Sequence, residues 1–162
     1  MTQPTPRCLI FACGNTLRGD DGVGLWLAEW AAQRFSNQPG VRVIADHQWT
    51  PELAEDVARA HSVLFIDCSI DSEPGSLNLT PVEPVSGGPE HNSHHLSAAE
   101  LLSLGRALYN SLPHESLQLT IGAGSTELGE SFSPAVTDAL PAACKLIEET
   151  VLRFLSDQEL SK

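Results

Sequence analysis

The sequence predicts an α/β protein: a three-layer α/β/α sandwich with a mixed, mostly parallel five-stranded sheet and one antiparallel edge strand. Short apolar runs alternate with amphipathic segments, which is the pattern of consecutive βαβ units. One link between two apolar runs, residues 71–75, is too short for the crossover that a parallel pair of strands requires. No repeat or domain-sized linker interrupts the 162 residues, so we expect a single domain over residues 1–162.

The first expected strand, residues 7–12, leads through a glycine-rich turn into a helix over residues 21–35. Asp20 or Asp21 can cap this helix, although two adjacent acids are more than one cap requires. The glycine spacing matches neither a P-loop nor a dinucleotide-binding turn. Glycines permit close approaches that a Cβ would prevent, and the turn contains Gly14, Gly19, Gly22 and Gly24.

The second expected strand, residues 41–45, precedes a short helix that begins after Thr50 and ends near His61. Thr50 followed by Pro51 gives a cap and then proline at the first helical position. The third strand, residues 62–67, is apolar at successive positions, so we expect it to be buried on both faces of the sheet.

The fourth expected strand, residues 76–82, should run antiparallel to the third because the link between them is short. Leu77 and Leu79 alternate with polar residues, and Pro81 is compatible with an edge strand.

The second half of the chain predicts one more strand between two helices. Ser97 and Glu100 form a capping box for a helix that runs to residue 110. The fifth strand covers residues 116–122, and a second glycine-rich loop follows it. The last helical region, residues 133–156, contains Pro141, which we expect to break or kink it.

Charge and composition restrict the classes of partner. The formal net charge of −12 argues against nucleic-acid binding, which requires clustered Lys and Arg. No apolar run approaches the ~20 residues that span a bilayer, and the N-terminal residues lack a signal-peptide pattern. We therefore expect a cytoplasmic protein that binds neither nucleic acid nor membrane, and we expect a monomer because no long apolar stripe is left unassigned.

Two acids and a histidine are expected to meet at one edge of the sheet. Asp21 and Asp67 follow two parallel, central strands, and His94 precedes the helix that begins at Ser97. Carboxylates with an imidazole suit divalent metals such as nickel, manganese, iron or zinc. The alternative is that Asp67 only accepts loop amides and that the histidines of residues 91–95 form a solvated loop.

Two other histidines and the cysteines are weaker candidates. His47, at the end of the second strand, could line the same cleft, and His114 has less support still. No C-x-x-C pair is present, so a zinc ribbon and a thioredoxin-type motif are excluded. Buried small residues are the simpler interpretation of the cysteines, with a site role held open for two beside the acids; the cysteines are Cys8, Cys13, Cys68 and Cys144.

The chain resembles the nickel-iron hydrogenase maturation proteases over nearly its whole length. Residues 14–24, GNTLRGDDGVG, match the family pattern G-N-x-L-x-x-D-[DE]-x-x-G. The resemblance implies Asp21 as the first metal ligand and Asp67, at the end of the third strand, as the second. It implies a histidine just before a leucine and a helix as the third; spacing to Leu96 favours His94, with His95 as the fallback. Residues 47–53 replace a glycine-rich turn found in many members, which leaves the class of partner hydrogenase open.

The resemblance implies an endopeptidase that removes the C-terminal extension of a hydrogenase large-subunit precursor after nickel insertion. Nickel would be the recognition signal, and Asp21, Asp67 and His94 would hold either the nickel supplied by the substrate or a nearby divalent metal. The metal could position the peptide and polarise its carbonyl, or the two aspartates could activate water as a shared-proton pair, as in aspartic proteases. Cys13 and Cys68 also leave a cysteine mechanism open.

Two functions from other classes remain compatible with the sequence. A non-catalytic nickel-binding maturation chaperone would use the same ligands but leave the precursor uncut. A small-molecule-binding regulator would use Asp20 and Asp21 only as helix caps and would bind no metal.

Overall fold

A computed structural model describes residues 4–86 and 96–160 of the chain. In this part the strands form one five-stranded sheet in the order β2-β1-β3-β5-β4, in which all neighbours are parallel except β4 and β5. The predicted mixed sheet with one antiparallel edge strand is confirmed. The strands are β1 (Cys8–Cys13), β2 (Val41–Asp46), β3 (Ser62–Ser69), β4 (Leu77–Pro81) and β5 (Glu115–Gly122).

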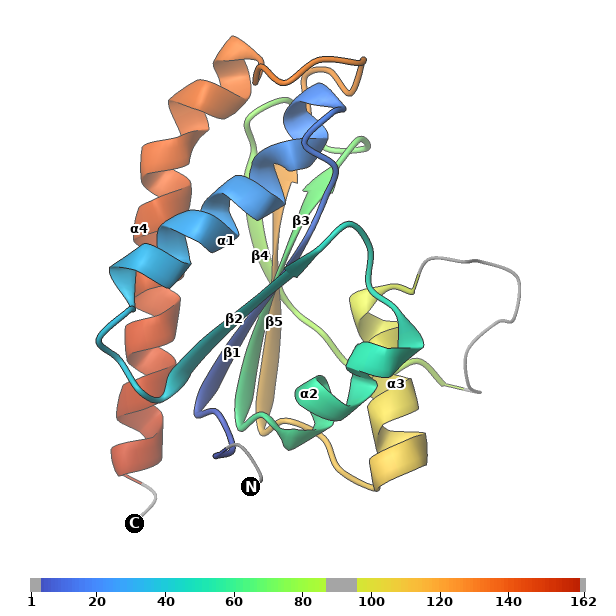
Figure 1. Cartoon of the computed structure of the whole chain (residues 1–162), viewed down its shortest axis with the longest axis vertical. Helices are drawn as coiled ribbons and strands as arrows, with labels where there is room; N and C mark the ends of the chain where they lie inside the picture. The colour runs from blue at the N-terminus through green and yellow to red at the C-terminus, as the bar shows by residue number, and fades with distance from the viewer. Residues whose placement is uncertain (1–3, 87–95, 161–162) are drawn as a thin grey trace.

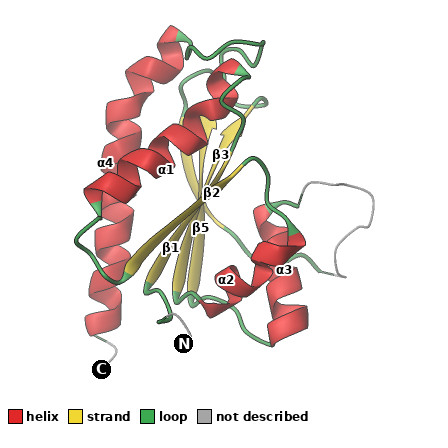
Figure 2. Ribbon diagram, in the orientation of Figure 1, coloured by secondary structure: helices red, strands yellow, loops and turns green. Residues whose placement is uncertain are grey.

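Helices cover both faces of the sheet, which gives the predicted three layers (Figures 1 and 2). One face carries α1 (Val23–Arg34) and α4 (Pro134–Glu159), and the other carries α2 (Ala54–Arg59) and α3 (Ala98–Tyr109). Two 3₁₀ turns, η1 (Gly19–Gly22) and η2 (Pro51–Leu53), lead into α1 and α2. None of the helices described has the length and apolar character that crossing a membrane would demand.

Strand alternation divides the core into two apolar clusters and determines which side the candidate residues face. Ile10 and Leu64 pack under α1 and α4, whereas Phe11 and Phe65 pack under α2 and α3. Because side chains alternate along a strand, Asp67 lies on the same face as Phe65, the face covered by α2 and α3.

β4 lies at the edge of the sheet and runs opposite to β3, as predicted, but its neighbour is β5. The intervening residues place β4 beyond the position that β5 later fills. Gly75 and Gly122 are joined there by a backbone hydrogen bond of 2.8 Å, which fixes the return of the chain beside β5.

Helix termini confirm some of the sequence predictions and correct others. The capping box is present, since the Ser97 side chain accepts from the Glu100 backbone and Glu100 accepts from the Ser97 backbone. Neither Asp20 nor Asp21 caps a helix, because η1 and α1 have no side-chain cap hydrogen bond. Of the predicted break or kink at Pro141, the break does not occur: α4 continues from Pro134 to Glu159, with buried side chains on both sides of the proline.

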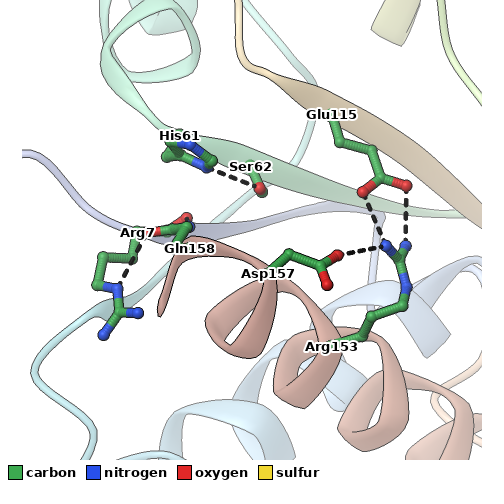
Figure 3. Close-up of polar contacts among 7 residues, drawn as sticks. All are labelled: Arg7, His61, Ser62, Glu115, Arg153, Asp157 and Gln158. Carbon is green, nitrogen blue, oxygen red and sulfur yellow. Dashed lines mark hydrogen bonds and ion pairs between the residues drawn. The ribbon is translucent and has the colours of Figure 1, made fainter. Parts of the chain in front are cut away.

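The C-terminal half of α4 is tied to the amino edge of the sheet, away from the candidate site (Figure 3). The guanidinium of Arg153 donates two 2.8 Å hydrogen bonds to the carboxylate of Glu115 at the start of β5. Arg7 donates to the Gln158 side chain at 2.9 Å, and Gln158 donates back to the Arg7 carbonyl at 2.7 Å. These contacts fix α4 along the sheet, so its N-terminus has a defined place at the carboxyl edge.

Candidate active site

The topology reverses between β1 and β3, and the candidate acids lie at that point. From β1 the chain passes through α1 to β2 on one side, and then through α2 to β3 on the other. The crevice at the carboxyl ends of such diverging strands is the usual ligand site of an open α/β sheet. Asp67 lies within β3 one residue beyond Ile66, which pairs with Ala12 of β1.

Asp67 is held by its neighbours on β3 and β1. Its Oδ1 accepts a 2.7 Å hydrogen bond from the Cys68 backbone N–H, and the thiol of Cys13 donates to the same carboxylate. Burial raises the pKa of Asp67, these hydrogen bonds oppose the rise, and the nearby charge of Asp21 adds to it, so that the pKa lies above its ordinary value. The amide that Asp67 accepts from belongs to the next residue of β3 and not to a loop, and the carboxylate also lies near the second acid.

Asp21 is half-buried at the end of a tightly folded turn. Its backbone carbonyl accepts from the Asn15 N–H at 3.1 Å, and its backbone N–H donates to the Arg18 carbonyl at 3.1 Å. A Cβ on Gly14 would overlap the Asp21 carbonyl oxygen, so only glycine allows the turn to close in this way. Since the Asp21 carboxylate caps no helix, it is available to a ligand.

Asp20 is fully buried and joins the turn after β1 to the segment before α4. Its Oδ2 accepts from the backbone N–H groups of Gly124 and Ser125 at 2.7 and 3.0 Å and from the Ser133 hydroxyl at 2.7 Å. Its Oδ1 accepts from the Ser133 backbone N–H at 2.7 Å. Burial raises the pKa of Asp20, but the four hydrogen bonds outweigh burial and hold the pKa below its ordinary value. The adjacent acids therefore differ in role, since Asp20 fixes two loops and Asp21 faces a cavity.

Asp21 and Asp67 line one cavity of about 330 Å³. His47 and Trp49, from the segment after β2, form another part of the wall, so the prediction that His47 lines the same cleft is confirmed. The indole N–H of Trp49 is buried without a hydrogen-bond acceptor in the described structure. The other lining residues are Cys13, Gly14, Gln48, Leu96, Ser97, Ala98 and Gln118.

The remaining candidate ligand, His94, and its fallback His95 lie outside the described residues, as does His91. Leu96 and Ser97, which directly follow them, line the cavity. Residues 4–86 and 96–160 contain no group of three or more His, Cys, Asp and Glu side chains that could hold a metal. These residues therefore supply two carboxylates, and a third ligand would have to come from elsewhere.

His114 is not part of this cavity. It immediately precedes β5, at the amino edge of the sheet, where its ring lies 5.3 Å from that of His61. The weak candidacy of His114 as a ligand beside Asp21 and Asp67 is therefore wrong, because the two positions are at opposite ends of the strands.

Known proteins share the fold of this chain. No protein-family profile matches the chain. The hydrogenase maturating endopeptidase HybD from E. coli superimposes with a TM-score of 0.74 over 91% of this chain and 93% of HybD, at 19% identity. The hydrogenase expression/formation protein HupM from Azotobacter chroococcum is 25% identical over 98% of this chain and 76% of HupM. The [NiFe] hydrogenase maturation protease HycI from Thermococcus kodakarensis is 25% identical, with a TM-score of 0.65 over 90% of this chain and 91% of HycI.

The chain is similar in fold to hydrogenase maturation proteases. In this chain, residues 14–24 form the turn that presents Asp21, and the glycines of that turn are explained by its close backbone contacts. The sequence did not indicate that Asp20 fixes two loops or that Trp49 lines the cavity. The signal for Trp49 was an aromatic residue directly before a helix start, at the carboxyl end of a parallel strand.

The thiols near the two acids are poor nucleophiles in this protein. Burial, together with the negative charges of Asp21 and Asp67, raises the pKa of Cys68 to about 12. Burial and the same acids also raise the pKa of Cys13 strongly. Because the thiolate is the reactive form, raised pKa values disfavour the cysteine mechanism.

Proposed function

We propose that this protein is an endopeptidase that removes the C-terminal extension of a nickel-iron hydrogenase large-subunit precursor after nickel has been inserted. One observation carries the proposal: the carboxylates of Asp21 and Asp67, from separate segments of the chain, line a single cavity. The relatives support the reaction class, since HybD is a hydrogenase maturating endopeptidase and HycI is a [NiFe] hydrogenase maturation protease. We propose that the protein acts as a cytoplasmic monomer.

Nickel in this proposal arrives with the substrate and marks a precursor that is ready for cleavage. The donor set fits a divalent ion, because two carboxylate oxygens and one imidazole leave positions open for groups of the substrate. Asp21, Asp67 and His94 would hold the ion, with His95 as the fallback for the third position. A bound divalent ion would supply Lewis-acid polarisation of the scissile carbonyl.

The protein residues orient the acids and hold protons at defined atoms. The Cys68 backbone N–H and the Cys13 thiol fix the plane of the Asp67 carboxylate, and burial favours its protonated form. In the alternative in which the two aspartates activate water without ligating the ion, a protonated Asp67 donates to the carbonyl oxygen while the Asp21 carboxylate accepts a proton from the attacking water. The water oxygen then bonds to the carbonyl carbon, the C–N bond breaks, and a proton passes to the leaving amine. Close positioning of the peptide can remove ~7–11 kcal/mol of the barrier.

Mass spectrometry of a large-subunit precursor, with and without this protein and nickel, tests the proposal. We expect loss of the mass of the C-terminal tail only when the nickel-loaded precursor and the protein are both present. An intact precursor that nevertheless forms a nickel-dependent complex with the protein would support the maturation chaperone instead. Cleavage of a nickel-free precursor at the same rate would contradict the role of nickel as the recognition signal.

A further inference from the structure

An apolar groove lies on the other side of the turn that presents Asp21. Its volume is about 380 Å³, and its lining includes Trp26 on α1 and Phe132 just before α4. Trp26 is 40% exposed, although a tryptophan on a helix that packs on a sheet would ordinarily be buried. The other lining residues are Thr16, Gly22, Leu25, Glu29 and Glu130.

Two further apolar side chains lie on the backbone segments that border this groove. Leu17 is 57% exposed and Leu128 is 86% exposed. The segments run side by side, since the Gly129 N–H donates to the Leu17 carbonyl at 2.9 Å and the Gly19 N–H donates to the Gly129 carbonyl at 2.7 Å. Figure 1 shows these two loops next to each other, beyond the carboxyl edge of the sheet. Exposed apolar side chains on segments that border an apolar groove are typical of an interaction site.

The groove is formed before any partner arrives. Asp20 bonds the turn after β1 to Gly124, Ser125 and Ser133, which fixes the two loops relative to one another. A preformed surface loses little conformational entropy on binding, so its apolar contacts contribute to affinity without a large ordering cost.

The charge around the groove restricts the kind of segment that can bind there. Among the described residues, the ionisable side chains that line the groove are Glu29 and Glu130, and none of these lining residues is a lysine or arginine. The chain as a whole carries a formal charge of −12. An apolar segment flanked by Lys or Arg would match this surface, whereas an acidic segment would be repelled.

We propose that this groove is the docking site for an apolar segment, flanked by basic residues, of the folded body of the hydrogenase large-subunit precursor. The inference rests on the proposed function. Asp21 lines the catalytic cavity and the next residue, Gly22, lines the groove, so the two sites share one turn as a common wall. A precursor whose tail enters the cavity therefore lies over the groove, and Trp26 is its central contact because tryptophan is typical of interface hot spots.

Affinity of the full-length protein for nickel-loaded precursor, measured by biolayer interferometry, tests the docking site. We expect Trp26→Ser to weaken binding at least 10-fold and to raise KM with kcat unchanged, because Trp26 does not line the cavity. Glu130→Lys keeps the apolar surface, and we expect it to weaken binding and to flatten its salt dependence. Leu108→Ser is the matched control, since Leu108 is 61% exposed on α3, on the opposite face of the sheet, and its affinity should be that of the wild type.

The outcomes separate this inference from the proposed function. A wild-type protein that binds the precursor through Trp26 but leaves it uncut would end the protease proposal and keep the docking site. Cleavage by the wild type, with Trp26→Ser and Glu130→Lys both unchanged in affinity and KM, would overturn the docking site alone. Sedimentation could instead show that the wild type is a dimer and that Trp26→Ser is a monomer. The groove would then bind a second copy of the chain, which would also overturn the proposed docking site. Melting curves establish that each variant is folded.

Discussion

Ser133 donates two 2.7 Å hydrogen bonds to Asp20, one from its backbone N–H and one from its hydroxyl. The same hydroxyl accepts from the Val136 N–H and so caps the N-terminus of α4. The turn after β1 is therefore fixed to the start of a helix more than one hundred residues later. Since Asp21 is the next residue, the position of one cavity acid depends on a contact that its neighbour makes.

Asp20→Asn should destabilise the protein by about 1–3 kcal/mol, the usual cost of leaving buried hydrogen-bonding groups unsatisfied. An amide can replace one carboxylate oxygen, but its NH₂ group faces donors that it cannot accept from. Urea unfolding gives the free energy. Asp138→Asn, an exposed aspartate on α4, is the control and should be neutral. Equal stability of the two variants would show that the Asp20 contacts contribute little.

The sequence could identify the acidic pair but not divide its roles. Asp20 and Asp21 are chemically identical, and capping rules give each the same prediction because they consider only nearby residues. The hydrogen-bond donors that bind Asp20 and not Asp21 belong to Gly124, Ser125 and Ser133, which are more than one hundred positions away in the sequence. Only the packed fold brings them into contact, and burial of Asp20 follows from that packing.

The fold was easier to predict from the sequence than the site, because strands and helices are indicated by short stretches of consecutive residues. Continuous apolar runs predicted the central strands β1 and β3, and the short link before β4 predicted its reversed direction. The short link did not predict which strand pairs with β4. The neighbour of β4 is β5, which comes later in the chain and lies between β3 and β4. Local rules also predicted a break at Pro141, whereas tertiary packing of residues such as Val136 and Ala143 keeps α4 continuous.

Glu115→Gln should reduce the pH dependence of stability in the acid range. The hydrogen bonds from Arg153 lower the pKa of Glu115, burial opposes them, and the charge of Arg153 lowers it further. Because the pKa of Glu115 is lower in the folded protein, its carboxylate stabilises the fold at pH values above the pKa of the unfolded state, about 4.3. This stabilisation is lost as the pH falls through the pKa of the folded state. We expect the pair, which is partly exposed (Figure 3), to contribute about 0.2–1 kcal/mol.

Unfolding at pH 7 and pH 3 in low salt measures this effect. The wild type should lose more stability between the two values than Glu115→Gln does. Glu149→Gln is the control, because the carboxylate of Glu149 lies 3.9 Å from Lys145 and is well exposed. The same acid response in the wild type and Glu115→Gln would contradict the expectation.

Gly24→Ala should destabilise the protein, although glycine-to-alanine changes in helices usually stabilise by about 0.5–1 kcal/mol. A Cβ on Gly24, the second residue of α1, would overlap the Cys13 carbonyl oxygen and lie 3.4 Å from the Ile66 carbonyl oxygen. Helix α1 would have to move away from β1 and β3, at a cost of about 1–3 kcal/mol. Thermal unfolding gives the sign, and a higher melting temperature would show that α1 is not closely packed there.

Cys68→Ala should cleave the precursor at a rate close to the wild type, whereas Asp67→Asn should lose about 10²–10⁴-fold. The Cys68 thiol is protonated at neutral pH, and its backbone N–H, which holds Asp67, remains in the variant. Asp21→Asn should lose activity as Asp67→Asn does. Single-turnover cleavage followed by mass spectrometry provides the rates. An inactive but folded Cys68→Ala would restore the cysteine mechanism.

His94→Ala should abolish processing and leave the fold intact, if His94 supplies the imidazole beside Asp21 and Asp67. The chain after it enters the cavity wall at Leu96 and Ser97, so a residue two positions earlier is close enough in sequence to contribute a ligand. His95→Ala is the matched control, because it removes the adjacent imidazole from the same segment and should retain processing. Gel-shift assays on nickel-loaded precursor compare the two variants. Full processing by His94→Ala, with loss in His95→Ala, would assign the third ligand to His95, and full processing by both would remove histidine from the proposed site.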